Sequence, residues 1–203
     1  SKNLLLILTR NPELGKCKTR LAATIGDQAA LEVYKILLDH TVHITQELPC
    51  DKHVYYSERI IQQDIWDNDL FVKKLQRGTD LGQRMQDAFQ SGFNEGYKKV
   101  VVIGSDMYEL DHKDIMNAFA KLDDHDAVLG PAKDGGYYLL GMKQLFPSVF
   151  HSKNWGTHTV FEDTMKDLQG MNVSLLDERN DVDRYEDILG IPAFKPFLID
   201  LRP

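Results

Sequence analysis

The stretch LLLILTRNPELGKCKTRL, residues 4–21, decides the fold of this 203-residue chain. Its first part, residues 4–8, is continuously apolar, as is typical of a strand that is buried on both faces of a parallel sheet. The second part turns at Gly15 and concentrates positive charge between Lys16 and Arg20. Open α/β sheets bind ligands beyond the carboxyl ends of their strands, where loop N–H groups are free. The order of these parts therefore predicts an α/β sheet with an anion site, for phosphate, after its first strand.

Composition limits the kind of protein that this chain forms. With 42% hydrophobic and 27% charged residues, residues 1–203 are expected to form one soluble domain. The net charge of −7 argues against a nucleic acid or an anionic membrane as partner, since both need a cationic surface. No apolar run approaches the roughly 18 residues of a membrane span, and no signal-peptide pattern opens the sequence. We therefore expect a cytoplasmic protein without a membrane span.

The two cysteines, Cys17 and Cys50, are too few for a disulfide framework and lack the spacing of a metal site. Cys17 lies among cations, which would lower the pKa of its thiol and make it a candidate reactive group. The sequence places no histidine and acid beside it, so an inert cysteine is the alternative.

Short apolar runs alternate with helical patterns along the whole chain. This alternation predicts a three-layer α/β/α, Rossmann-like fold with a mostly parallel central sheet. The two glycines before Tyr137 indicate one antiparallel strand. Asp80 and Asp111 are expected helix N-caps, and Gly96 and Gly170 are expected helix ends. The expected strands are 4–8, 53–56, 70–75, 100–103, 127–129, 137–140 and 173–176, and the expected helices are 28–46, 81–94, one after Asp111, 158–169 and 184–189.

The basic segment is neither a P-loop nor a GxGxxG dinucleotide fingerprint. If it is extended, its alternating side chains put Lys16, Lys18 and Arg20 on one side, toward a single polyanion. An arginine can hold phosphate oxygens in a bidentate fork, whereas a lysine acts as a point charge. Thr19 would add a hydroxyl donor. The alternative is a solvated basic loop.

A first acidic candidate, Asp106, follows the apolar run 100–103 and the flexible Gly104. It should therefore lie at the carboxyl edge of the sheet, opposite the basic loop. A carboxylate in that place is expected where a divalent cation bridges protein and diphosphate. The alternative is a helix N-cap, a role for which Asp111 competes. We predict that Asp106 binds Mg²⁺ or Mn²⁺.

A second acid is expected because Mg²⁺ commonly takes one or two protein carboxylates. The segment DERNDVDRYED, residues 177–187, is the obvious donor. Asp181 and Asp183 alternate with Val182, so both acids face one side if the chain is extended there. We select Asp183 as the second ligand. The alternative is an acidic, solvated loop that caps a short final helix.

The segment GPAKDGGYYLLG, residues 130–141, combines four glycines with a charged pair, Lys133 and Asp134. Glycines permit close approach of the backbone to a ligand. We predict that Asp134 positions an acceptor or acts as a base. A hairpin with DGG as its turn is the alternative, and it explains the glycines but not the charged pair.

Taken together, GKCKTRL, DLGQRM, GSD, GPAKDGGYYLLG and DVD resemble the motifs of the bacterial DUF2064 proteins. These are commonly called glycosyltransferases and have the GT-A nucleotide-diphospho-sugar transferase fold. The resemblance spans residues 15–183 and implies a nucleotide over the loop of the first strand and a metal at the acid after the central strand, here Asp106. The family usually has Cys-Pro after GSD, whereas Met107 and Tyr108 follow here. A more distant resemblance extends to guanylyltransferases that act on small phosphorylated acids.

These features predict a metal-dependent transferase with a nucleotide-activated donor, preferably a nucleotide sugar, and a small acceptor. Catalysis would then rest on stabilisation of the diphosphate leaving group. The alternatives are a nucleotidyltransferase that releases pyrophosphate and a non-catalytic nucleotide sensor. The assigned residues are Thr9, Gly15, Lys16, Lys18, Arg20 and Arg84 for nucleotide or phosphate, Asp106 and Asp183 for Mg²⁺ or Mn²⁺, Asp106 and Asp134 for catalysis, and Gly135, Gly136, Trp155 and Thr157 for an acceptor loop.

Overall fold

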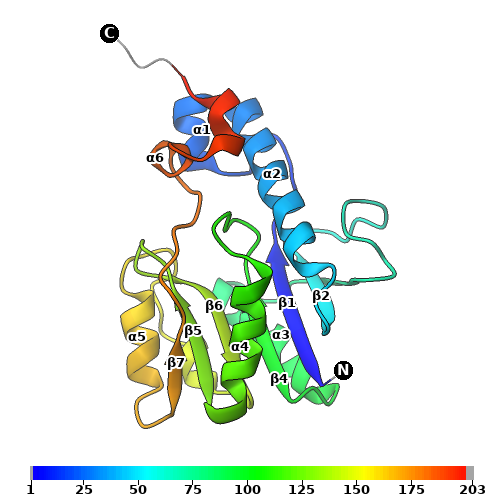
Figure 1. The fold of residues 1–203 in the computed structure, drawn as a ribbon, viewed down its shortest axis with the longest axis vertical. Helices are drawn as coiled ribbons and strands as arrows, with labels where there is room; N and C mark the ends of the chain where they lie inside the picture. The colour runs from blue at the N-terminus through cyan, green and yellow to red at the C-terminus, as the bar shows by residue number, and fades with distance from the viewer. Residues whose placement is uncertain (1, 200–203) are drawn as a thin grey trace.

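The computed structural model describes residues 2–199 and contains a seven-stranded sheet with the strand order β3-β2-β1-β4-β6-β5-β7 (Figure 1). In this sheet β6 pairs antiparallel with β4 and β5, and the other pairings are parallel. The predicted sheet, mostly parallel with one antiparallel strand, is therefore confirmed. The strands are β1 (Asn3–Thr9), β2 (Asp51–Tyr56), β3 (Val72–Leu75), β4 (Lys99–Ile103), β5 (Ala127–Pro131), β6 (Tyr137–Met142) and β7 (Val173–Leu175).

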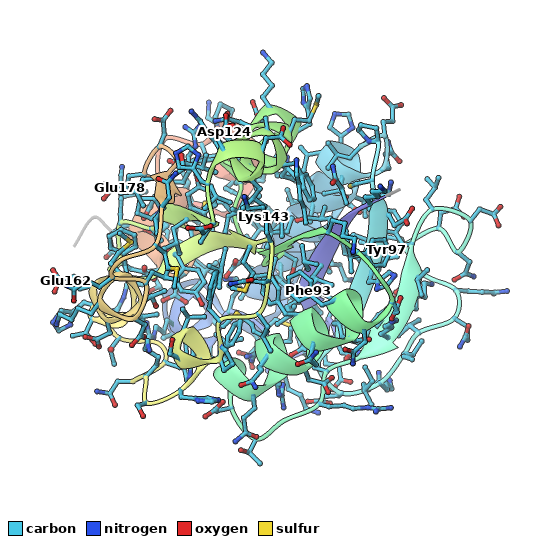
Figure 2. The ribbon with its side chains drawn as sticks, turned by 90° about the horizontal axis from the view of Figure 1, so that it is seen from below. Phe93, Tyr97, Asp124, Lys143, Glu162 and Glu178 are labelled. Atoms are coloured by element: carbon cyan, nitrogen blue, oxygen red, sulfur yellow. The ribbon has the colours of Figure 1, made fainter. Side chains whose placement is uncertain are left out.

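Helices cover the two faces of the sheet and give the predicted three layers. Figure 2 shows the sheet between α3, which carries Phe93, and α4, which ends at Asp124. Two clusters of buried side chains fill the spaces between the sheet and its helix layers. One face carries α1 (Thr19–Ile25), α2 (Asp27–Thr45), α4 (His112–Asp124), α6 (Tyr185–Ile188) and the 3₁₀ helix η2 (Pro192–Phe197), and the other carries α3 (Leu81–Asn94), η1 (Pro147–Phe150) and α5 (Val160–Asp167).

Strand β1 is apolar because both of its faces are covered. Leu4 and Leu6 pack in the cluster on the α3 side, whereas Leu5 and Ile7 pack in the cluster on the α2 side. All four side chains are fully buried. Successive side chains of a strand point to opposite faces, so a strand covered on both sides reads as a continuous apolar run.

Aspartates cap two of the helices as predicted. The Asp80 side chain accepts a hydrogen bond from the backbone N–H of Gln83 at the start of α3. Asp111 caps α4, and the side chain of Asp114 accepts from the backbone N–H of Asp111 in return. Because Asp111 satisfies the first N–H groups of α4, Asp106 is not the cap of that helix.

The basic segment is not the extended chain that we expected. Lys18 has a left-handed backbone, with φ +50°, and is the N-cap of α1, which begins at Thr19. The expected extended segment is therefore replaced by a turn at residues 14–16 and a helix from Thr19, so the alternation that was to align the three cations does not apply.

The sequence predicts no membrane-spanning segment, and the helices of the structure can be compared with this prediction. The 19-residue α2 has the length of a span, but it carries polar and charged side chains on its exposed face. Among residues 2–199, no helix is both long enough and apolar enough to cross a bilayer.

Candidate active site

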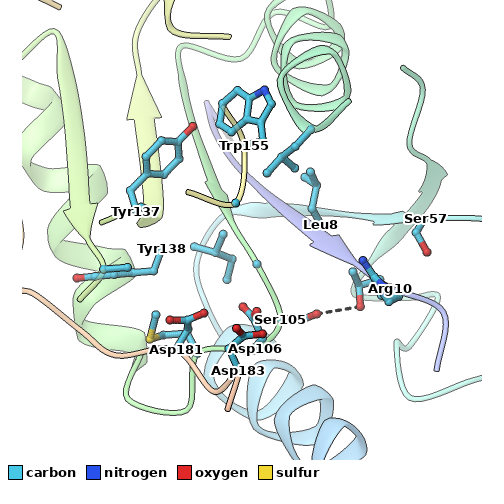
Figure 3. A pocket seen from close by; sticks show the side chains of 18 of the residues that line it. Leu8, Arg10, Ser57, Ser105, Asp106, Tyr137, Tyr138, Trp155, Asp181 and Asp183 are labelled. Atoms are coloured by element: carbon cyan, nitrogen blue, oxygen red, sulfur yellow. Dashed lines mark hydrogen bonds between the residues drawn. The ribbon is translucent and has the colours of Figure 1, made fainter. Parts of the chain in front are cut away.

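A cavity of about 770 Å³ lies beyond the carboxyl ends of β1 and β4, at the edge of the sheet that the sequence predicts. Its walls come from the loops that follow these strands, from the turn before β6 and from the first turns of α3. Segments 155–157 and 181–183 close its sides. Figure 3 shows acidic side chains at one end of this cavity and Tyr137 and Trp155 at the other.

Three carboxylates, those of Asp106, Asp181 and Asp183, border the acidic end of the cavity. The backbone N–H of Val182 donates to the carbonyl oxygen of Asp106 over 3.1 Å, which ties the 181–183 segment to the loop after β4. Val182 is itself buried, and its neighbours Asp181 and Asp183 both face the cavity. The predicted alternation of these acids is therefore confirmed, and Figure 3 shows both beside Asp106.

Asp181 is a site residue that we did not assign. Burial raises the pKa of its carboxyl to about 7, and the nearby charges of Asp106 and Asp134 add to this shift. The alternation with Asp183 pointed to Asp181, but only its burial distinguishes the two.

Two ion pairs face the cavity. Lys18 Nζ lies 3.0 Å from Asp106 Oδ2, and Arg20 Nη1 lies 2.9 Å from Asp183 Oδ2. The Lys18 side chain is only 9% exposed. Burial opposes its charge, but the carboxylates of Asp106 and Asp183 outweigh burial and raise the pKa of Lys18. The Arg20 pair is much more exposed, and such surface pairs contribute little to stability.

Lys16 and Gly15 are not brought to the cavity. Lys16 Nζ lies 2.7 Å from Glu13 Oε2 and 3.8 Å from Glu58 Oε2, and its side chain is 58% exposed. Lys16 lies in a turn, where its backbone N–H donates to the carbonyl oxygen of Glu13 over 3.1 Å, and this corrects the expected row of three cations. Arg10, which we did not assign, does border the cavity and donates to the carbonyl oxygen of Lys16 over 3.0 Å.

Thr9 borders the cavity, but its hydroxyl belongs to a buried network. Thr9 Oγ1 lies 3.1 Å from Ser105 Oγ and 3.3 Å from the Tyr34 hydroxyl. The Tyr34 hydroxyl also accepts from the backbone N–H of Arg10 over 2.9 Å. Thr9 therefore fixes the end of β1 against the loop that carries Asp106.

The Cys17 thiol is not a reactive group of the expected kind. Its side chain is buried, and Sγ lies 3.5 Å from the carbonyl oxygen of Asn11. Burial raises the pKa of the thiol and outweighs the lowering by Arg10 and Lys18. The expectation of a lowered pKa is therefore wrong.

Asp134 occupies the turn between β5 and β6. Its Oδ1 accepts from the backbone N–H of Gly136 over 2.9 Å, and Ala132 N–H donates to the Gly136 carbonyl oxygen over 3.0 Å. Asp134 and Gly136 border the cavity, and Lys133 does not. The segment is thus both a hairpin and a wall of the site.

Gly135 supports the site from behind. Its φ is +90°, and a Cβ at this position would lie 2.2 Å from the carbonyl oxygen of His158. Its own carbonyl oxygen accepts from the N–H of Phe161 over 2.9 Å, which fixes the start of α5. Gly135 does not border the cavity, in contrast to the acceptor role that we assigned to it.

Replacing Gly135 by alanine should lower the free energy of unfolding by about 3 kcal/mol, because backbone strain and a clash with backbone atoms act together. Gly170→Ala is the matched control, since Gly170 has φ +88° and open space where the Cβ would lie. It should cost about 1 kcal/mol, the strain term alone. Urea unfolding measures both values. Equal losses would show that the contact with His158 is unimportant.

The first turns of α3 support the opposite wall. Arg84 borders the cavity, with Nε donating to the Gly78 carbonyl oxygen over 3.1 Å and Nη1 to Gln76 Oε1 over 3.3 Å. At Gly82 a Cβ would lie 2.1 Å from the Phe150 carbonyl oxygen and 2.8 Å from the Trp155 ring. Only glycine lets this segment lie against α3. The predicted acceptor-loop residues Trp155 and Thr157 both border the cavity.

A family model described as an uncharacterized protein conserved in bacteria (DUF2064) matches residues 40–157, more than half of the chain. The chain belongs to the DUF2064 family. The match includes Asp106 and Asp134 but ends before Asp181 and begins after Arg20. The Lys18–Asp106 pair thus has one partner inside the matched region, and both partners of the Arg20–Asp183 pair lie outside it.

Solved structures extend the likeness of this DUF2064 protein to most of its length. A protein from Desulfovibrio desulfuricans G20, provisionally named a nucleotide-diphospho-sugar transferase, is 32% identical with a TM-score of 0.84, over 91% of this chain and 83% of that one. A cytidylyltransferase from Leptospira borgpetersenii is 13% identical with a TM-score of 0.58, over 92% and 83% of the two chains. The latter likeness shows the fold alone. No curated protein matches the chain.

Proposed function

We propose that this DUF2064 protein is a metal-dependent transferase whose donor is a nucleotide sugar. The observation that carries the proposal is the pairing of Lys18 with Asp106 and of Arg20 with Asp183 inside one cavity. A diphosphate with a bound divalent cation presents the complementary charges, phosphate oxygens for the two cations and a metal ion for the two acids. The likeness to the Desulfovibrio protein supports a nucleotide-sugar donor.

The acids fit a divalent cation by their chemistry. Carboxylate oxygens are ligands that Mg²⁺ and Mn²⁺ prefer, and Asp106, Asp181 and Asp183 border the same cavity. Within residues 2–199, no three His, Cys, Asp or Glu side chains form a ready-made metal site. Asp106 and Asp183 would therefore hold the ion together with phosphate oxygens and water. When bound, the ion would neutralise charge that develops on the leaving diphosphate.

Lys18 and Arg20 supply the rest of the charge stabilisation. Each is held by a carboxylate, so each becomes available to phosphate oxygens when that carboxylate turns to another cation. The Lys18 side chain is nearly buried, and a charge interacts more strongly there than in water. When the donor binds, Lys18 and Arg20 would thus pair with phosphate oxygens, and Asp106 and Asp183 would pair with the metal ion. Each charged group of the two ion pairs would keep a partner of opposite charge.

The transfer step places the acceptor near Asp134. The acceptor oxygen bonds to the anomeric carbon while the bond from that carbon to the β-phosphate oxygen breaks. The electron pair leaves with the nucleoside diphosphate, and the hydroxyl proton passes to Asp134 or to water. Asp134 is exposed at the cavity wall and positioned by its bond to Gly136, as a base or an orienting group requires.

Product analysis tests this function. The protein is incubated with Mn²⁺, a panel of nucleotide sugars and nucleoside triphosphates, and a mixture of small hydroxylated compounds. We expect nucleotide sugars to be consumed with release of nucleoside diphosphate. Pyrophosphate formed from a triphosphate, without nucleoside diphosphate, would favour a nucleotidyltransferase instead. Tight binding without any turnover would favour a nucleotide sensor.

A further inference from the structure

The end of the cavity away from the acids has a different chemistry. Figure 3 shows Tyr137 and Trp155 there, across the cavity from Asp106 and Asp183. Leu81, which begins α3, also borders this end and leaves 43% of its surface exposed. One cavity therefore joins a charged end to an aromatic and apolar end.

Helix α3 holds the two aromatic side chains next to each other. The Trp155 ring lies against Gly82, where a Cβ would come within 2.8 Å of it. The Tyr137 hydroxyl lies 3.7 Å from Met85 Sδ. Positions 82 and 85 are three apart on one helix, so they are neighbours on one face. Trp155 and Tyr137 thus form one continuous wall, whose position is fixed by a regular element.

Polar side chains that border this wall each make hydrogen bonds inside the protein that fix their positions. Asp80 Oδ1 accepts from the N–H of Gln83, and Arg84 donates to Gly78 and to Gln76. Thr157 Oγ1 donates to the carbonyl oxygen of Asn154 over 2.6 Å. These bonds hold the polar side chains in place, and the surface offered to a ligand between them includes the two aromatic rings and Leu81. An apolar ring gains from burial alone.

We propose that this aromatic end is the acceptor subsite and that it selects an acceptor with an aromatic or other apolar ring beside its reacting hydroxyl. The inference rests on the proposed function, since it takes the charged end as the donor site. With its ring against Trp155 and Tyr137, the acceptor would point its hydroxyl toward the turn that carries Asp134, which forms part of the same cavity.

The fluorescence of Trp155 can report the binding of a ligand at this end of the cavity. The chain has two tryptophans, and Trp66 is buried against Phe71 with ring centroids 5.1 Å apart. Trp66→Phe therefore leaves Trp155 as the one indole. Phenyl β-D-glucoside and methyl β-D-glucoside are matched probes that differ only in the aglycone. We expect the phenyl compound to change Trp155 emission with at least tenfold higher affinity, since burying one ring contributes about 1.5–3 kcal/mol and each 1.4 kcal/mol is tenfold.

Leu81→Gln removes apolar surface at an exposed helical position, where the fold should tolerate it. It should weaken the phenyl probe severalfold and leave the affinity for a nucleoside diphosphate with Mn²⁺ unchanged. Equal affinity for the two glucosides, or no effect of Leu81→Gln, would overturn the apolar subsite.

A nucleoside diphosphate with Mn²⁺ distinguishes an acceptor from a base at this end. If the inference holds, the phenyl probe binds together with the nucleotide. Competition between the phenyl probe and the nucleotide would overturn the inference and indicate that the nucleobase binds at the aromatic end. Selective and non-competitive binding of the probe without any turnover would support the subsite and count against the proposed function alone.

Discussion

Asp106→Asn should abolish the metal-dependent part of nucleotide binding and lower turnover by at least about 100-fold, the range found when one group that stabilises a transition state is removed. Asparagine keeps the shape of the side chain but not its charge. The variant should still bind a nucleoside diphosphate in EDTA, because Lys18 is then free of its carboxylate partner 3.0 Å away. Calorimetric titration in Mn²⁺ and in EDTA measures both parts.

Asp183→Asn gives a graded comparison for Asp106. Asp183 pairs with Arg20, whose side chain is 56% exposed, so water screens the interaction between the two charges. We therefore expect Asp183→Asn to lose less metal-dependent binding and less turnover than Asp106→Asn. Asp124→Asn, at the end of α4, is the control without effect. If Mn²⁺ still strengthens nucleotide binding in Asp106→Asn as much as in the unchanged protein, the metal assignment is wrong.

Lys18→Met should weaken nucleoside diphosphates by about 10- to 100-fold and leave nucleosides unaffected. A hydrogen bond to a charged group contributes about 1.5–3 kcal/mol, and only the diphosphate presents the oxygens that this ammonium group would contact. Methionine preserves the apolar stem of a side chain that is 9% exposed. Calorimetry with a nucleoside diphosphate and with the matching nucleoside gives the comparison.

Lys16→Met makes the same chemical change two residues away. Lys16 faces Glu13 and is 58% exposed, outside the cavity, so its loss should change affinity less than twofold. Similar losses of affinity in the two variants would mean that the loop acts through its overall positive charge. The position of Lys18 in the cavity would then not support a specific phosphate contact.

The sheet was predictable because its strands are covered on both faces. Buried strands read as continuous apolar runs, and the runs at 4–8 and 100–103 agree with β1 and β4 within about one residue at each end. The expected helix 158–169 is shorter in the structure, where it spans Val160–Asp167. The ends of a helix fray, and their exact positions depend on tertiary contacts that the sequence pattern does not show. Helix α1 was missed because its start depends on one left-handed residue, Lys18.

The site was predictable where it follows strand ends and unpredictable where it depends on burial. Asp106 and Lys18 meet because β1 and β4 are neighbours in the sheet, and the carboxyl edge indicated this for both. The raised pKa values of Asp181 and Cys17 come from desolvation, which no local pattern reveals. Lys16 was misplaced because residues 14–16 form a turn, with Gly15 at φ +76°, where we expected an extended chain.

Reciprocal titration of Mn²⁺ and a nucleoside diphosphate tests most directly whether the two ion pairs of the cavity exchange partners on binding. Each ligand should strengthen binding of the other by the same factor, at least tenfold, after correction for the complex that they form in solution. The factor should fall toward one in Asp106→Asn. Independent binding of the two ligands, or an equal factor in that variant, would contradict a shared site for diphosphate and metal.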